Sequence, residues 1–273
     1  MFNLASLYKP LTAQALKFVS CLPCDSLKPF IADYWGTADV FQTKANNQPV
    51  FVIPDACMDV IFTVNHTAGT VSGQLCGMGE TANTFVPVVT ADVISTFSIR
   101  FYFWSIHFFA DHHLRDTMVS YNDAFLYFKG WKPFFTEMLL GTFSLRERSE
   151  KTDRFLLSKL DESKHNHHIM NALYHVMKRR GASSVPEACA YACVSQRQLE
   201  RLFMEHIGTT VKKTLNLVRY QNLWRDIVFQ ENFDVQDAVL KYGFTDQAHL
   251  INSFRYHHSM SPLEALQAIR LHV

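Results

Sequence analysis

The stretch YGFTDQAHLINSFRYHHSMSP, residues 242–262, decides how the second half of this chain folds. A tight break precedes Asp246, a residue of the kind that caps the start of a helix. In the helix that follows, Leu250 and Phe254 stand four positions apart on one face, and polar side chains occupy the opposite face. The stretch therefore predicts an amphipathic helix after a tight turn, with an outward surface that is polar and charged.

The same pattern occurs a second time, at residues 185–208. Each copy has a short helix with a central alanine, a tight break, a cap and a second helix, and aligning the caps Ser195 and Asp246 gives an offset of 51 residues. Any amphipathic helix exposes polar residues, so one copy alone would say little. Two copies joined by an expected helix over 211–229 predict two helix-turn-helix motifs, in which Arg and Asn side chains point outward.

Composition and charge favour two globular domains of different character. The chain has 273 residues, with 48% hydrophobic and 19% charged side chains, which is typical of a folded protein of this length. The net charge of +1 indicates no partner by itself. From Lys164 onward, however, 13 basic residues face 9 acidic ones, whereas the first 163 residues carry 13 against 16. The second half is therefore where a nucleic acid would bind.

The first half has the pattern of short strands separated by turns. Residues 51–64 and 70–80 are rich in β-branched or aromatic residues with Pro-Asp and glycine breaks, and 94–109 alternates in part. These runs predict an antiparallel sandwich or barrel. After residue 111 the spacing becomes helical, and the charged run at 146–154 predicts either a linker or a solvated helix face.

The expected domain boundaries follow from these changes of pattern. Ser184 and Glu187 fit a capping box at the start of the first motif. The expected segments are a β-rich domain over 1–145, a linker over 146–164, and a helical domain over 165–273 that contains the first motif at 184–207, a linking helix at 210–229 and the second motif at 234–257.

These motifs resemble the AraC/XylS family of bacterial transcription regulators, whose DNA-binding domain carries two helix-turn-helix motifs linked by a long helix. The resemblance covers about 165–270. It rests on Ala238, Tyr242-Gly243-Phe244, Asp246-Gln247, Phe254-Arg255 and Ser261-Pro262 in the second motif, and on Ala188, Ser195, Leu199, Phe203, Gly208 and Arg219 in and after the first.

Two positions depart from the family pattern. Cys193 stands where the family usually has a turn glycine, and Ser259 replaces the glycine before the Ser-Pro pair. A non-glycine residue in the left-handed conformation costs on the order of 1 kcal/mol, so we expect local strain or a shifted turn without loss of the fold.

The resemblance implies which residues contact DNA. Its base-contacting positions fall at Gln196, Arg197, Glu200 and Arg201 in the first recognition helix, and at Gln247, Ala248, His249 and Asn252 in the second. Arg201 is the strongest candidate, Glu200 would bind cytosine or steer orientation, and Ala248 offers only apolar contact to a thymine methyl group. The expected phosphate contacts are Lys178, Arg179, Arg180, Lys241 and Arg255.

The first half resembles, less specifically, the small cupin-like β-domain that precedes this DNA-binding unit in one subgroup. Ser98-Ile99-Arg100-Phe101 stands where the subgroup has Gly-x-Arg-Phe, but Phe103-Trp104 replaces its Pro-Gly. The expected fold is therefore an α+β chain: a cupin-like jelly roll or barrel followed by an all-α domain. A pocket for an apolar effector would be lined by Phe51, Phe62, Phe97, Phe101 and Trp104, although these residues could equally form a filled core.

Other classes of function have weaker signals. No His-x-His precedes residue 164, and His107, Asp111 and His112-His113 have ligand spacing that solvated residues share, so we expect no enzyme, metal or cofactor. Cys21 and Cys24 form one CxxC without a second, which favours an incidental role, with thiol sensing as the alternative. The chain shows neither a secretory signal nor about 20 consecutive apolar residues, which predicts a cytoplasmic protein without a membrane span.

The sequence thus predicts a transcription regulator that inserts two recognition helices into successive major-groove segments of double-stranded DNA. The expected partners are RNA polymerase, a small-molecule effector in the first domain and a second copy in a homodimer. One alternative is a ligand-independent regulator controlled by abundance or by a protein partner, and a remote one is a cupin-type metalloenzyme. Whether the chain is an activator or a repressor stays open.

Overall fold

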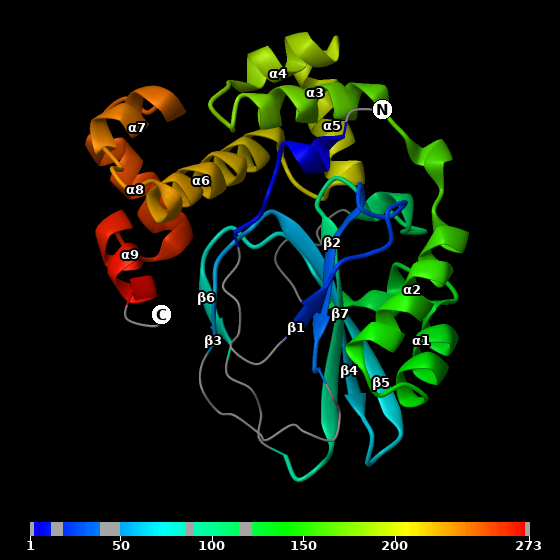
Figure 1. The fold of residues 1–273 in the computed structure, drawn as a ribbon. Helices are drawn as coiled ribbons and strands as arrows, with labels where there is room; N and C mark the ends of the chain where they lie inside the picture. The colour runs from blue at the N-terminus through cyan, green and yellow to red at the C-terminus, as the bar shows by residue number, and fades with distance from the viewer. Residues whose placement is uncertain (1–2, 12–18, 39–49, 86–89, 115–121, 271–273) are drawn as a thin grey trace.

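A computed structural model describes residues 3–11, 19–38, 50–85, 90–114 and 122–270. Two sheets occupy one part of the molecule, helices α1 and α2 cover one side of the larger sheet, and the helices from α3 onward lie beyond its end (Figure 1). The first half is thus an antiparallel β-rich region and the second half is helical, which confirms the expected fold class. In the described ranges no helix is both long and apolar enough to cross a lipid bilayer.

The larger sheet is antiparallel, and β7 lies at its centre between β2 and β4. Strands β4 and β7 pair over nine residues, from Cys57 opposite Tyr102 to Asn65 opposite Ile94. Along the sheet the strands are β1 (Val19–Cys21), β2 (Ile31–Gly36), β7 (Ile94–Tyr102), β4 (Cys57–Asn65), β5 (Thr70–Cys76) and β8 (Asn122–Asp123), while β3 (Val50–Val52) pairs with β6 (Asn83–Phe85) in the smaller sheet.

The two faces of the larger sheet differ because side chains alternate along each strand. Phe62, Phe97 and Phe101 lie on the face that the helices cover, and all three are fully buried. Phe62 stacks on Phe135 of α1 (Trp131–Leu140) with 4.3 Å between ring centroids. These phenylalanines therefore pack as a filled core, and their expected role in an effector pocket stays a prediction.

The opposite face of the same sheet is polar. Asp59 accepts hydrogen bonds from the indole nitrogen of Trp35 (2.8 Å) and from the Ser98 hydroxyl (3.2 Å). Arg100 forms an ion pair with Asp55, and its Nη2 lies 3.7 Å from Asp59. Burial raises the pKa of Asp59 to about 7. A ligand approaching this face would meet charged and hydrogen-bonding groups, not the predicted aromatic lining.

Helix α2 (Leu145–Lys159) occupies most of the segment expected to be a linker. Arg148, which is 1% exposed, donates to the backbone carbonyl groups of Leu139 and Thr142 at 3.2 and 3.0 Å. The carboxylate of Asp153 accepts hydrogen bonds from the Cys24 backbone (3.0 Å) and from the Tyr34 hydroxyl (2.7 Å). The charged run is thus a structural helix packed on the sheet, neither a tether nor merely a solvated face.

The second half contains two short-helix, turn, long-helix units joined by one long helix. The helices are α3 (His167–Lys178), α4 (Val185–Ala192), α5 (Gln196–His206), α6 (Val211–Phe229), α7 (Val235–Tyr242), α8 (Gln247–His258) and α9 (Pro262–Arg270). Short 3-10 helices occur at η1 (Leu4–Ser6), η3 (Ile106–Phe108), η4 (Ala124–Leu126) and η5 (Glu162–Lys164). The capping box is present: Glu187 accepts a 2.7 Å hydrogen bond from the Ser184 backbone and its own backbone donates to the Ser184 hydroxyl.

The turns at the two departures from the family pattern keep the left-handed conformation. Cys193 has φ 55° at the end of α4, and Ser259 has φ 62° at the end of α8. Both side chains therefore occupy a backbone region that disfavours a Cβ atom, at an expected cost of about 1 kcal/mol each. The fold is kept and the strain is local, as the sequence predicts.

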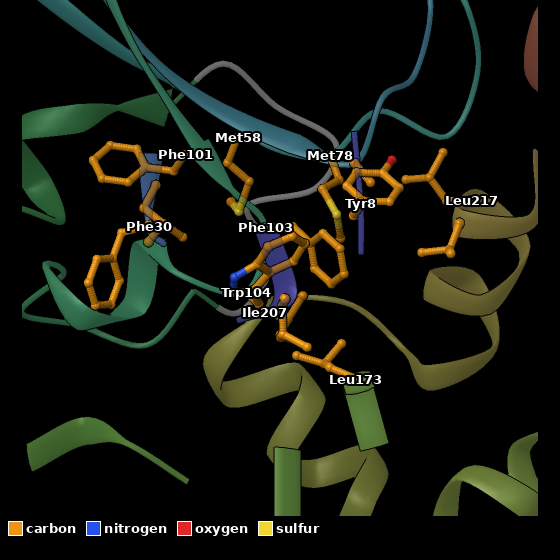
Figure 2. Packing of buried hydrophobic residues seen from close by; sticks show 14 of the residues in the cluster. Tyr8, Phe30, Met58, Met78, Phe101, Phe103, Trp104, Leu173, Ile207 and Leu217 are labelled. Atoms are coloured by element: carbon orange, nitrogen blue, oxygen red, sulfur yellow. The ribbon is translucent and has the colours of Figure 1, made fainter. Parts of the chain in front are cut away.

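A continuous hydrophobic core joins the β-rich and helical parts. Figure 2 shows Phe103 and Trp104, which follow β7, next to Ile207 at the end of α5 and near Leu173 of α3. Trp104 is 2% exposed and stacks on Tyr102 with 4.5 Å between ring centroids. Trp104 is therefore part of the core between the two halves, and its expected role in a ligand pocket stays a prediction.

Candidate nucleic-acid interface

Helices α5 and α8 each bury one face and expose the other. Leu199 and Phe203 of α5 are fully buried, as are Leu250 and Phe254 of α8. Their N-caps also correspond: Ser195 accepts from the Gln198 backbone and Asp246 from the His249 backbone. The exposed predicted positions are Gln196, Arg197 and Arg201 on α5, and Gln247, Ala248, His249 and Asn252 on α8.

The two arginines of α5 differ in their surroundings. Nη1 of Arg201 lies 3.0 Å from Oε2 of Glu205, one helical turn further on, and the Arg201 side chain is 57% exposed. An i,i+4 pair contributes only about 0.3–0.5 kcal/mol when both side chains are exposed. Glu205 is 17% exposed, so exchanging this pair for another acceptor costs Arg201 somewhat more. Arg197 has no ion-pair partner within 4 Å in the part of the chain that the structure describes.

Glu200 has a role that the sequence did not indicate. Its carboxylate accepts a 3.2 Å hydrogen bond from the backbone nitrogen of Val211, the first residue of α6. A carboxylate at a helix N-terminus satisfies a free N–H group and is favoured by the helix dipole. Glu200 is half-buried there and braces α5 against α6, and its expected contact with a base stays a prediction.

His249 is exposed but held close to the start of α8. Its Nδ1 lies 3.3 Å from the Thr245 hydroxyl, and its ring meets Phe244 edge-on at 5.2 Å between centroids. The imidazole is therefore oriented by the turn between α7 and α8, with its remaining edge available to a partner.

The expected phosphate contacts form two groups. Lys178, Arg179 and Arg255 are exposed. Arg180 and Lys241, by contrast, both face Asp226 of α6, with nitrogen–oxygen distances of 3.9 and 2.6 Å. These two cations have a counter-charge within the protein.

Asp226 was missed by the sequence analysis. Its Oδ2 also accepts a 2.6 Å hydrogen bond from the hydroxyl of Tyr242, a fully buried residue at the end of α7. The sequence does contain a signal for this residue, because Asp226 is the one acidic residue in the otherwise basic stretch 211–229.

Arg219 fixes both motifs to α6. Its Nε donates to the backbone carbonyl of Gly181, in the turn after α3, at 3.1 Å. Its guanidinium also lies over the ring of Phe244, 5.3 Å from the centroid, in the turn between α7 and α8. One side chain thus contacts the segments that precede the two recognition helices.

The β-rich part contacts the second recognition helix directly. The Glu80 carboxylate pairs with Lys213 of α6 and accepts a 2.9 Å hydrogen bond from the Tyr256 hydroxyl of α8. The backbone of Ala82 donates to the carbonyl of His257 at 2.7 Å. These bonds connect the loop after β5 to α6 and to the carboxyl end of α8.

The titratable groups outside this surface include a histidine and two cysteines with shifted pKa values. The described parts of the chain contain no cluster of three or more His, Cys, Asp or Glu side chains that could hold a metal ion. His107 is buried against His206, with ring centroids 4.9 Å apart, and burial lowers its pKa to about 3. Burial likewise raises the pKa of both Cys21 and Cys24, which disfavours the reactive thiolate.

Comparison with known proteins agrees with this geometry. Residues 188–268 match the helix-turn-helix domain family, and residues 19–121 match a domain of unknown function (DUF6597). A search of curated protein sequences gives no match. The chain is therefore a DNA-binding transcription regulator of the helix-turn-helix class. The match supports the expected resemblance of this domain to AraC-type regulators.

Solved structures include similar chains. A transcriptional regulator with an AraC-type DNA-binding domain from Chromobacterium violaceum is 26% identical over 37% of this chain and 89% of its own, with a TM-score of 0.34. ToxT from Vibrio cholerae O395 is 12% identical over 96% of this chain and 97% of ToxT, with a TM-score of 0.36. Wild-type ToxT of strain SCE256 with a bound unsaturated fatty acid is 10% identical over 92% and 95%, at 0.37. At these TM-scores the likenesses do not bear on the fold or ligand of this chain.

Proposed function

We propose that the chain binds double-stranded DNA sequence-specifically by inserting α5 and α8 into successive segments of the major groove. The observation that carries this proposal is the duplicated geometry, in which both helices bury a leucine and a phenylalanine in the same register and expose the opposite face. An α-helix fits the major groove of B-DNA, and exposed Arg, Asn and Gln side chains can bind base edges there.

The surroundings of each side chain support the roles that we propose. Arg197 and Arg201 are proposed to bind guanine edges from α5, and Asn252 to bind adenine from α8. The exposed cations Lys178 and Arg179 are proposed to contact phosphates. Gln196, Gln247, Ala248, His249 and Arg255 complete the proposed surface.

We also propose that the β-rich part restrains the recognition helices. The support is the set of bonds from Glu80 and Ala82 to Lys213, Tyr256 and His257, because any change in the loop after β5 would move α6 and α8. A small-molecule effector, a homodimer, RNA polymerase as partner and a cytoplasmic location stay predictions of the family resemblance. Control by abundance or by a protein partner stays the alternative.

The test is a comparison of two arginine variants. Duplexes that the full chain enriches from a random pool are compared with a scrambled duplex, using Arg201→Ala and the control Arg146→Ala. Arg146 forms an ion pair of the same sequence spacing, 2.9 Å from the more exposed Glu150 one turn further on, but on α2. We expect Arg201→Ala to weaken binding to the enriched duplex by about 1–3 kcal/mol, with little change on scrambled DNA.

The outcomes separate the roles. Equal losses on both duplexes would make Arg201 a phosphate contact. If the chain enriches no sequence from the pool and binds no duplex, the proposal of sequence-specific DNA binding is wrong. A loss of similar size in Arg146→Ala would show that the effect is one of overall charge and not of α5.

A further inference from the structure

The junction between the two helix-turn-helix units is organised around one carboxylate. Asp226 lies on α6, and its side chain is 14% exposed. It accepts hydrogen bonds from Lys241 and Tyr242 at 2.6 Å each, and Nη1 of Arg180 lies 3.9 Å away. We call these four residues the Asp226 junction.

The partners of Asp226 come from both units. Arg180 follows α3, next to the first motif, while Lys241 and Tyr242 end the first helix of the second motif. Because α6 joins the motifs, a carboxylate on α6 that holds both neighbours fixes their relative orientation. Burial raises the pKa of Tyr242, so its hydroxyl stays a donor to the carboxylate.

The junction also changes the charge that the protein offers to DNA. Phosphate contacts give affinity without sequence information, and each one adds to the salt dependence of binding. Arg180 and Lys241 are exposed cations on the basic half of the chain, and Asp226 gives both of them an internal counter-charge. A cation held in this way is less available to phosphate than Lys178 or Arg179.

We infer that Asp226 is a specificity-determining positioning residue, which holds Lys241 and Arg180 away from DNA phosphates and so limits sequence-independent binding. This inference rests on the proposed function, because it requires the chain to bind DNA. It predicts that the residue raises the ratio of specific to non-specific affinity without touching a base.

The experiment measures salt dependence on a scrambled duplex by fluorescence anisotropy, with the full chain. The variant Asp226→Asn keeps the size of the side chain and a carbonyl acceptor for Tyr242 but removes the charge. We expect the slope of log affinity against log salt to steepen by about 1–2, and the affinity to rise roughly 8-fold per added contact near 0.1 M salt. On an enriched duplex the rise should be smaller, so that the specificity ratio falls.

Lys241→Gln supplies the control, in the native chain and in the Asp226→Asn background. If Asp226 withholds Lys241, the single change leaves the slope unaltered, whereas in the Asp226→Asn background it returns the slope toward the native value by about 1. A shallower slope in the single variant would show that Lys241 already contacts phosphate, and the inference would be overturned even if Asp226→Asn failed to fold.

The remaining outcomes are also decisive. Weaker binding of Asp226→Asn to both duplexes with an unaltered slope would leave Asp226 a purely structural role and overturn the inference. Native protein that binds no duplex would overturn the proposed function as well. Binding by the native chain with no response to Asp226→Asn would overturn only the role of Asp226.

Discussion

Replacing Gly181 with alanine should damage the joint between the first motif and α6. Gly181 has φ 75°, in the left-handed region, and it lies in the turn after α3. An added Cβ atom would stand 2.4 Å from the backbone nitrogen of Arg219 and 2.6 Å from the backbone oxygen of Leu215. Both atoms belong to the backbone of α6, so no side-chain rotation relieves the collision.

The expected loss of stability has three parts. Alanine in the left-handed conformation costs about 1 kcal/mol. The collision also forces α6 to move away, and overpacking of this kind costs about 1–3 kcal/mol. The same movement weakens the hydrogen bond from Arg219 Nε to the Gly181 carbonyl, for about 1 kcal/mol more. We therefore expect Gly181→Ala to lower the free energy of unfolding by roughly 3–5 kcal/mol.

Gly243 provides the matched control. It also follows a helix and has φ 64°, but no atom lies within 4 Å of the Cβ that alanine would add. Gly243→Ala should therefore lose only the conformational part, about 1 kcal/mol. Urea denaturation followed by circular dichroism measures both variants. Equal losses would refute the reasoning, because the close approach of α6 would then contribute nothing.

Three further changes test other parts of the structure. Cys193→Gly should raise the free energy of unfolding by about 0.5 kcal/mol by relieving the left-handed strain, and a loss measured by thermal denaturation would contradict this. Burial lowers the pKa of His107 to about 3, so its contribution to stability is complete above the ordinary pKa of 6.5 and falls by about 2 kcal/mol by pH 5. His107→Gln should therefore make the free energy of unfolding depend less on pH between 6.5 and 5. An unchanged pH dependence would show that His107 is not its source. Glu80→Ala should accelerate hydrogen exchange of the Ala82 amide about 5–30-fold by releasing Lys213, and unaltered exchange would show that the contact carries no stability.

The helical half could be predicted from sequence because its signals are local. The linking helix was expected at 211–229 and spans Val211–Phe229, and the caps Ser195 and Asp246 begin α5 and α8 as expected. Caps and helical periodicity depend on neighbours within one or two turns, so they can be read without tertiary information.

The β-rich half was less predictable because alternation along a strand defines two faces without saying what covers each. Phe62, Phe97 and Phe101 share a face, as the alternation requires, but the sequence could not show that α1 and α2 pack on it. The packing of helix α2 on the sheet could not be predicted for a related reason. The partners of its buried Arg148 are backbone carbonyl groups and the hydroxyls of Thr142 and Ser95, which no sequence pattern marks.

The same reasoning explains which of the expected DNA-contacting residues have partners within the protein. The helical period predicts which polar residues point away from the core. It does not predict which of them meet hydrogen-bond donors or acceptors on other helices. Glu200 meets the free N-terminus of α6, and Arg180 and Lys241 meet Asp226. Arg201 pairs with the half-buried Glu205 one turn further along its own helix, a contact within one helix that DNA can replace. Affinity for base edges should therefore concentrate on side chains whose internal partners are weak or lacking, because binding then requires no strong bond within the protein to break.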